Sequence, residues 1–150
     1  MNQSNLRTVV LVQCTNQKRD EIAPAKHLYD ESTYFVKQRE YAETADAWYV
    51  QSAKHGLVLP NEWLHPYNKH AKDLDQPAKW ARKIAAELSN RHGTATVEIL
   101  GGRAYADPLR PALEARGFRV TEPLDGLGIG ERMAELGRMV EGVTHAPLHG

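Results

Sequence analysis

Residues 7–13, RTVVLVQ, form a short apolar run rich in β-branched side chains and without polar alternation. Such a run is typical of a strand that is covered on both faces, as in the centre of a parallel sheet. The run ends abruptly in the polar segment 14–20, CTNQKRD, which predicts a loop directly after the strand. The first strand is therefore expected to lie in the core and to place polar residues at one edge of a sheet.

Three further strands and four helices are expected to follow. The strands are expected at 47–52, 94–100 and 118–121, and the helices at 33–44, 76–91, 108–116 and 131–141. Strands that alternate with helices imply right-handed crossovers and a mainly parallel sheet. The sequence thus predicts an α/β fold: one three-layer α/β/α domain over residues 1–150, with a four-stranded sheet and a frayed tail at 142–150.

Composition and charge exclude several classes of protein. Lys+Arg and Asp+Glu number 19 each, so a protein that coats polyanions through its net charge is excluded, although a local cleft can still be basic. The single cysteine, Cys14, excludes an internal disulfide and a zinc site built from cysteines. The histidines lack metal-binding spacing, so neither a metal nor another cofactor is expected. No segment resembles a membrane span or a secretory signal, which predicts a cytoplasmic protein without a membrane partner.

Small, glycine-bearing or cationic loops follow all four predicted strands. In an open α/β sheet, ligands bind at the carboxyl ends of the strands. We therefore expect these loops to meet on one rim, with Lys18 and Lys54 facing a shared cavity that suits a phosphate, a carboxylate or developing negative charge. The rim segments are 14–18, 52–56, 101–105 and 123–130.

Several polar side chains in or near these loops also have a purely structural explanation. Cys14 is a small residue of a type that often fills a core and is then inert. Lys18 and Lys54 are equally well explained as solvated loop lysines. His27 and His55 are explained in the same way as residues that cap a turn or fill a gap.

Two other segments have alternative interpretations. The glycines at 126–130 follow a G-x-G-x-G spacing rather than GxGxxG and lie near the C-terminus, so they give little support to a dinucleotide site. The alternative interpretation is that these glycines serve only to let the last helix pack close to the sheet. Residues 61–67, NEWLHPY, are interpreted either as a lid with an aromatic stacking surface or as a buried turn.

Taken together, several segments resemble the DUF6884 group, a family of small uncharacterised bacterial, archaeal and phage proteins. The matching segments are CTNQK at 14–18, AKHLY at 25–29, WYVQSAKHGLV at 48–58, GG at 101–102 with Tyr105, and PLDGLGIG at 123–130. The segment 48–58, with Pro60, Leu64, Pro66 and Tyr67, also resembles the signature of the YaaA family of peroxide-stress proteins. The likeness covers nearly the whole chain.

A more distant likeness is to the core domain of archaeosine synthases. Cys14 and Lys18 keep the Cys-to-Lys offset of that family, and His27 and Tyr29 stand near the positions of its His and aromatic residue. In that family the lysine is implicated in attack on a modified base in tRNA, so the resemblance implies that Lys18 is a nucleophile or an electrostatic group. These relatives look like members of the uracil-DNA-glycosylase-like α/β/α superfamily, which is what the resemblance implies about the fold.

These residues are compatible with three functions. The first is an enzyme that acts on a nucleobase of DNA, RNA or a nucleoside, by N-glycosidic cleavage or related processing of a modified base. Such an enzyme packs the extruded base on aromatic rings, and a nearby cation stabilises the charge that develops on the departing base. The second is a DNA- or nucleotide-binding protein without turnover, in stress or phage defence. The third is a structural or regulatory module.

The candidate residues can be grouped by their expected role. Catalysis is expected from Lys18, Lys54, His55 and Glu62, with Asp107 as a second carboxylate that could orient water. Substrate binding is expected from Cys14, Thr15, Asn16, His27, Tyr29, Ser52, Gly56, Tyr67, Gly101, Tyr105, Gly126 and Gly128. Tyr29, Tyr67 and Tyr105 are the expected stacking rings, and Asn16 and Gln51 the expected readers of the base edge.

Overall fold

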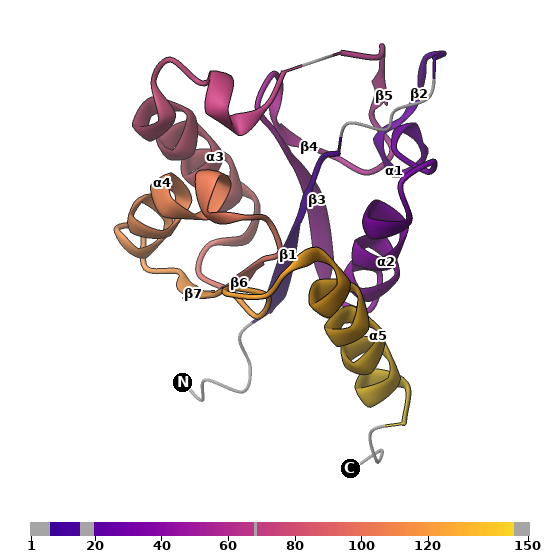
Figure 1. The fold of residues 1–150 in the computed structure, drawn as a ribbon. Helices are drawn as coiled ribbons and strands as arrows, with labels where there is room; N and C mark the ends of the chain where they lie inside the picture. Colours follow the sequence, from indigo (N-terminus) through magenta and orange to yellow (C-terminus); the bar gives the residue numbers. More distant parts are fainter. Residues whose placement is uncertain (1–6, 16–19, 68, 146–150) are drawn as a thin grey trace.

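A five-stranded sheet forms the centre of the protein (Figure 1). The structure is a computed structural model that describes residues 7–15, 20–67 and 69–145. The strands of the sheet are β1 (Thr8–Gln13), β3 (Ala47–Ser52), β4 (Gly56–Val58), β6 (Thr96–Ile99) and β7 (Arg119–Thr121). They lie in the order β4-β3-β1-β6-β7, and all neighbouring pairs except β3 and β4 are parallel.

Strand β1 is the centre of this sheet, as its sequence predicts. Residues 9–12 have no exposed surface, and Leu11 pairs with Tyr49 of β3 on one side and Ile99 of β6 on the other. Full burial of an aliphatic side chain of this size stabilises a fold by about 1.5–3 kcal/mol. The run of β-branched residues therefore explains why β1 occupies the position that is covered on both faces.

The sheet has five strands rather than the four that the sequence predicts. The additional strand, β4, returns antiparallel to β3 after a tight turn, with Val50 opposite Val58. Gly56 begins β4 with φ at +74°, a conformation that glycine adopts without steric cost. Only three residues long, β4 is too short to show a recognisable period in the sequence. A separate two-stranded sheet joins β2 (Ala23–Pro24) to β5 (Trp63–Leu64).

Helices cover both faces of the sheet, which confirms the expected three layers (Figure 1). The helical elements are α1 (Ala25–Leu28), α2 (Thr33–Ala42), the 3-10 turn η2 (Ala71–Asp73), α3 (Pro77–His92), α4 (Arg103–Glu114) and α5 (Ile129–His145). Helices α3 and α4 lie on one face, and α1, α2 and α5 lie on the other. Within the ranges that the structure describes, no helix combines the length and the apolar composition that a membrane crossing requires.

Two helices differ from their expected bounds by more than two residues at one end. Helix α4 begins at Arg103 rather than at Pro108, so that Pro108 and Pro111 lie inside it. Proline is common in the first turn of a helix, which is why the sequence suggests a later start. Helix α5 runs to His145, past its expected end at residue 141, and residues 146–150 lie outside the described part of the chain.

Candidate functional site

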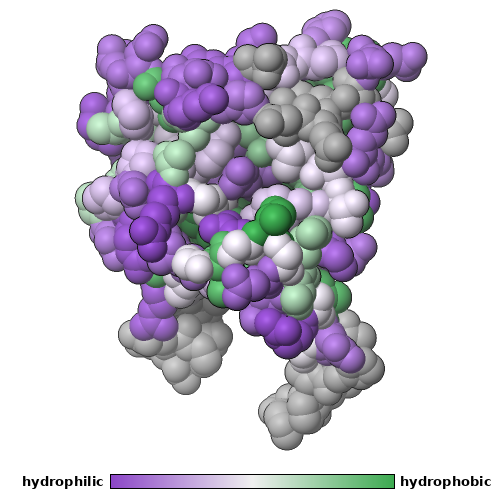
Figure 2. Space-filling model, viewed as in Figure 1, coloured by the Kyte–Doolittle hydropathy of each residue, from purple (hydrophilic) through white to green (hydrophobic). Residues whose placement is uncertain are grey.

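A cavity of about 510 Å³ lies at the carboxyl end of β1. Its lining residues come from segments far apart in the sequence: Gln13, Cys14, Thr15, Tyr34, His70, Ala71, Lys72, Ala104, Tyr105 and Ile129. Pockets that bind small molecules commonly measure about 300–1,000 Å³, so this cavity has the size for a nucleoside. On the face shown in Figure 2, pale and green residues are interspersed with hydrophilic ones, and several of them lie near the centre of the view. The convergence of strand-end segments makes this cavity the candidate site.

Gln13 joins the cavity to the helices on both sides of the sheet. Its backbone N–H donates to Gln38 Oε1 on α2 at 2.9 Å, and its own Oε1 accepts the N–H of Gly102 before α4 at 2.7 Å. The adjoining Gly101 leaves room for these amides, since a Cβ there would stand 2.5 Å from Gln51 Nε2 and 3.2 Å from Gln13 Oε1. The end of β1 is therefore held in a fixed position.

Cys14 and Tyr105 meet at the wall of the cavity. The Cys14 Sγ lies 3.2 Å from the Tyr105 Oη, and both residues are buried. Burial raises the pKa of Tyr105, and the neighbouring Cys14 raises it further. A tyrosine hydroxyl is protonated at neutral pH at its ordinary pKa, and the raised pKa of Tyr105 favours the same form, which can donate a hydrogen bond.

Tyr34 borders the same cavity from α2. Its hydroxyl donates to the Leu100 carbonyl at 3.4 Å and accepts from Arg132 Nη1 at 3.1 Å. A smaller cavity of about 210 Å³ adjoins here, and it shares Gln13, Tyr34 and Ile129 with the first while adding Arg132. The site therefore has an aromatic ring from each of α2 and α4 and a guanidinium group at its margin.

Five of the predicted residues form a separate cluster around the buried Tyr67. The Tyr67 hydroxyl is hydrogen-bonded to that of Tyr29 and accepts from Ser52 Oγ at 2.9 Å. The His55 ring stands edge-on to the Tyr67 ring at 5.0 Å, and Lys54 Nζ lies 5.9 Å from the centre of that ring. Among the described residues, none of these five lines the strand-end cavity.

Cys14 is the link between the cavity and the Tyr67 cluster. Burial raises the pKa of Tyr67, and Cys14 is the next cause of the increase. In Tyr29, burial again raises the pKa most, followed by Tyr67 and then Cys14. The hydroxyls near Cys14 therefore stay protonated and form a neutral hydrogen-bonding network behind the cavity wall.

His27 and Glu62 have local partners away from the cavity. The His27 Nδ1 lies 3.0 Å from Asp30 Oδ2 near the end of α1. Burial opposes ionisation of Asp30, but its hydrogen bonds with His27 and Arg39 lower the pKa of this carboxyl overall. The exposed Glu62 carboxylate accepts the N–H of Leu59 at 3.4 Å. Neither residue is brought to the cavity lining.

The remaining candidates lie at other places. Gly126 adopts φ of +81° in the loop after β7, and the N–H of Gly128 donates to the Glu131 side chain at 3.2 Å at the start of α5. Gln51 is fully buried and Asp107 is exposed, and neither lines the cavity. Lys18 and Asn16 lie outside the described residues. Their roles, and the expected approach of Lys18 to Lys54, stay predictions.

Several cavity residues are not predicted from the sequence. Gln13 belongs to a strand, and Tyr34 appears as part of an amphipathic helix. His70 lies in the irregular segment 57–71, which contains two prolines, and Lys72 directly follows it. None of these positions carries a local motif, because only the packing of α2 against β1 and of η2 against α4 brings them together. Within the described ranges, no three His, Cys, Asp or Glu side chains gather as a metal site.

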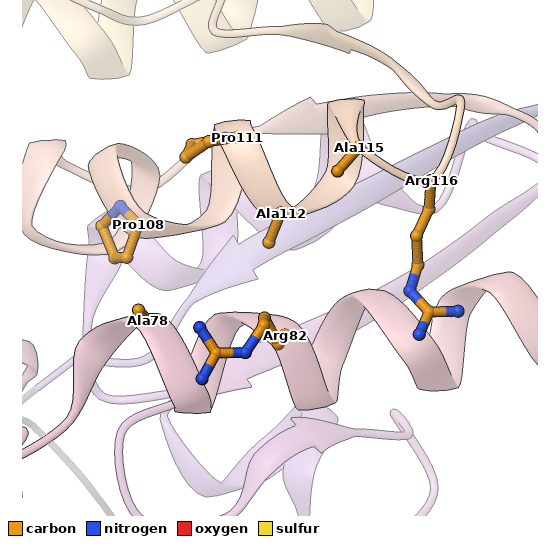
Figure 3. A pocket seen from close by; sticks show the side chains of 7 residues that line it. All are labelled: Ala78, Arg82, Pro108, Pro111, Ala112, Ala115 and Arg116. Carbon is orange, nitrogen blue, oxygen red and sulfur yellow. The ribbon is translucent and has the colours of Figure 1, made fainter.

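A groove of about 380 Å³ lies between α3 and α4 (Figure 3). It is lined by Ala78, Arg82, Pro108, Pro111, Ala112, Ala115 and Arg116. Arg116 reaches from the loop after α4 toward α3, and Arg82 lies along α3. The groove contains none of the predicted site residues and is not formed by the strand ends, so it is distinct from the candidate site.

The layers and the strand-end cavity define a three-layer α/β/α protein with a ligand-sized cavity at the carboxyl edge of its sheet. The model of the family of unknown function DUF6884 matches residues 9–138, and the chain belongs to this family. The matched segment includes every residue that lines the cavity. No curated protein and no solved structure matches the chain. The DUF6884 prediction is confirmed, while the likenesses to YaaA and archaeosine synthase gain no support.

Proposed function

We propose that this protein is an enzyme that acts on a nucleobase, by cleaving an N-glycosidic bond or by related processing of a modified base. The observation that carries the proposal is the strand-end cavity, which combines the rings of Tyr34 and Tyr105 with hydrogen-bonding groups from the end of β1. A fold of the uracil-DNA-glycosylase type, implied by the sequence resemblance, is part of this proposal.

The lining of the cavity suits a planar heterocycle. Stacking of a base on an aromatic side chain is worth about 1–3 kcal/mol, and Tyr34 and Tyr105 offer two such rings. The side chain of Gln13 lines the cavity, and its amide N–H₂ can donate to the edge of the base while its Oε1 accepts from Gly102. A base that is removed from its stack regains in this way part of the energy that extrusion costs.

The charges around the cavity suit a departing base. When the bond between C1′ and the base nitrogen breaks, its electron pair stays on the base, water adds its hydroxyl to C1′, and the base nitrogen gains a proton. Lys72 and the protonated Tyr105 hydroxyl both line the cavity and can stabilise that negative charge. Lys54, His55 and Glu62 lie away from the lining, so the proposed chemistry does not depend on them.

One observation favours the alternative of a nucleotide-binding protein without turnover. Among the described residues, no carboxylate lines the strand-end cavity, and Glu62 instead accepts a turn N–H. Hydrolysis without a carboxylate requires a different group to orient the water molecule. Binding without hydrolysis requires no such group, because the tyrosine rings, the Gln13 amide and the lysine of the cavity lining are sufficient to hold a nucleotide.

Release of free base distinguishes the two functions. Purified protein is incubated with DNA and RNA oligonucleotides that contain uracil, alkylated bases or oxidised bases, and free base is measured by chromatography. We expect Tyr105→Phe to release base at least about tenfold more slowly, because it loses a hydrogen-bond donor in the cavity. Tyr41→Phe is the matched control, since the Tyr41 hydroxyl donates to Glu98 away from the cavity. Thermal melting of both variants establishes that they are folded.

The possible results separate the functions as follows. The enzyme is supported if the wild type and Tyr41→Phe release free base at similar rates and Tyr105→Phe releases it more slowly. Oligonucleotide binding without release from any substrate rejects the enzyme and supports the binding protein. Absence of both rejects both functions. Lys18→Ala tests the separate, sequence-based prediction that Lys18 is the nucleophile.

A further inference from the structure

Another cavity, of about 300 Å³, lies beside the candidate site and is rich in lysine. Its lining residues are Ala53, Lys69, Leu74, Asp75, Gln76, Lys79, Trp80 and Lys83. Three of these side chains are cationic and only one is a carboxylate. The cavity therefore has an excess of positive charge, although the whole chain has a formal net charge of zero.

The two cavities are neighbours across η2 and share a wall of aromatic rings. Residues 70–72 line the strand-end cavity, whereas Lys69 and residues 74–76 line the lysine-rich one. The ring centres of Trp80 and Tyr105, one from each cavity, are 5.7 Å apart. Trp80 is held in place because its Nε1 donates to a backbone carbonyl of β3 at 2.9 Å. The two cavities are therefore adjacent, and this pair of rings separates them.

Within the described ranges, the lysines that line the two cavities have no acidic side chain as an ion-pair partner. They are Lys69, Lys72, Lys79 and Lys83. The nearby Asp73 carboxylate accepts the backbone N–H of His70 at 3.0 Å. These four lysines are half of the eight in the sequence. Concentrated charge of one sign in a cleft attracts ligands of the opposite sign.

We infer that this lysine-rich cavity binds backbone phosphates of a single-stranded polynucleotide whose base occupies the strand-end cavity. The inference rests on the proposed function and narrows its substrate class from base, nucleoside or nucleic acid to a polynucleotide strand. A single strand is favoured because the cavity receives a base that is out of its stack, and because a cationic groove with aromatic rings is the common design for binding single strands. Lys72 stands at the junction of the two cavities.

The test compares two variants that remove the same net charge from the same part of the fold. Lys79→Gln combined with Lys83→Gln changes the lysine-rich cavity, and Arg82→Gln combined with Arg116→Gln changes the groove between α3 and α4 (Figure 3). Binding of fluorescein-labelled single-stranded DNA and RNA oligonucleotides is measured by fluorescence anisotropy over a range of salt concentrations.

We expect the lysine variant to bind at least tenfold more weakly at low salt. A plot of the logarithm of the binding constant against the logarithm of the salt concentration should become less steep by about 1.4. This is the change expected when two phosphate contacts with a single strand are lost. At about 0.15 M salt the arginine variant should bind within about threefold of the wild type, because exposed charges farther from the ligand than the Debye length of about 8 Å are largely screened. Equal losses in both variants, or no loss in the lysine variant, would overturn the inference.

Two further ligands keep failure of the inference separate from failure of the proposed function. Free nucleosides should bind the wild type and the lysine variant equally, because they carry no phosphate. If nucleosides bind and oligonucleotides bind no better, the lysine site is rejected and the proposed function stands. If double-stranded DNA binds as well as single strands do, the assignment to single strands is overturned. If no ligand binds, the proposed function itself fails.

Discussion

Two fully buried glutamines show how differently one residue type can contribute to stability. Gln38 accepts the Gln13 N–H at 2.9 Å and donates to its carbonyl at 3.5 Å, whereas no described residue hydrogen-bonds either amide atom of Gln51. A buried amide without a partner costs about 1–3 kcal/mol. We expect Gln51→Met to raise the free energy of unfolding by about 1 kcal/mol, measured by urea denaturation, because it removes the unpaired amide and keeps the length of the side chain.

Gln38→Met is the matched control for Gln51→Met. It should lower the free energy of unfolding by about 1–3 kcal/mol, because it leaves the Gln13 backbone groups without their partner. Equal destabilisation by both substitutions would contradict the prediction and would indicate a bound water at Gln51. An increase in stability for Gln51→Met alone would show that its amide is not needed to hold the sheet together.

At the scale of secondary-structure elements, the turn between β3 and β4 depends on the conformation of one glycine. Gly56 has φ of +74°, while a Cβ there would make an ordinary 3.9 Å contact with Ile84. Gly56→Ala should therefore destabilise the fold by about 1–2 kcal/mol through backbone strain and not through a clash. Thermal or urea denaturation measures this loss. A change below a few tenths of a kcal/mol would mean that the turn adjusts without cost.

A glycine inside helix α5 is a position where substitution by alanine should stabilise the fold. Gly137 lies in α5 and is exposed, and a Cβ added there would meet no neighbouring group of the described chain within 4 Å. Gly137→Ala should raise the free energy of unfolding by about 0.5–1 kcal/mol, because alanine loses less conformational entropy than glycine in a helix. Opposite signs for Gly56→Ala and Gly137→Ala in the same assay would separate the turn effect from a general effect of added methyl groups.

The elements that local pattern predicts well are those whose burial repeats along the chain. Helix α3 has nearly its expected bounds because Ala81, Ile84, Ala85 and Leu88 form one buried face. Strand β4 and the turn η2 are not predicted, because each is three residues long and is fixed by its neighbours. The unpredicted hairpin also explains why Lys54 and His55 stand against Tyr67 and outside the strand-end cavity.

At the scale of the whole molecule, the sequence predicts where the candidate site lies better than it predicts which residues line that site. The carboxyl edge of a parallel sheet follows from the strand pattern, and Cys14, Thr15 and Tyr105 do line the cavity there. His70 and Lys72 come from a segment without periodicity, so only the folded chain places them at this edge. Long-range packing of irregular segments is the part of the site that single-sequence patterns do not encode.

Two histidines make the stability of the whole molecule depend on pH. Partial burial lowers the pKa of His55, with Lys54 adding to the effect and Glu62 opposing it, and partial burial followed by nearby arginines lowers the pKa of His92. In the unfolded chain the pKa returns to about 6.5. Between each lowered value and about 6.5, the unfolded state binds more protons than the folded state, so stability is lost as the pH falls through this window.

Replacing both histidines tests this dependence. We expect His55→Gln combined with His92→Gln to flatten the fall in unfolding free energy below about pH 6.5, as measured by urea denaturation at several pH values. At about pH 8, where histidines are neutral in both states, the variant and the wild type should differ only by a constant, which includes the lost contact of His92 Nε2 with Tyr49 Oη at 2.6 Å. If the variant keeps the slope of the wild type between about pH 5 and 6.5, other groups govern the acid sensitivity and these two imidazoles do not.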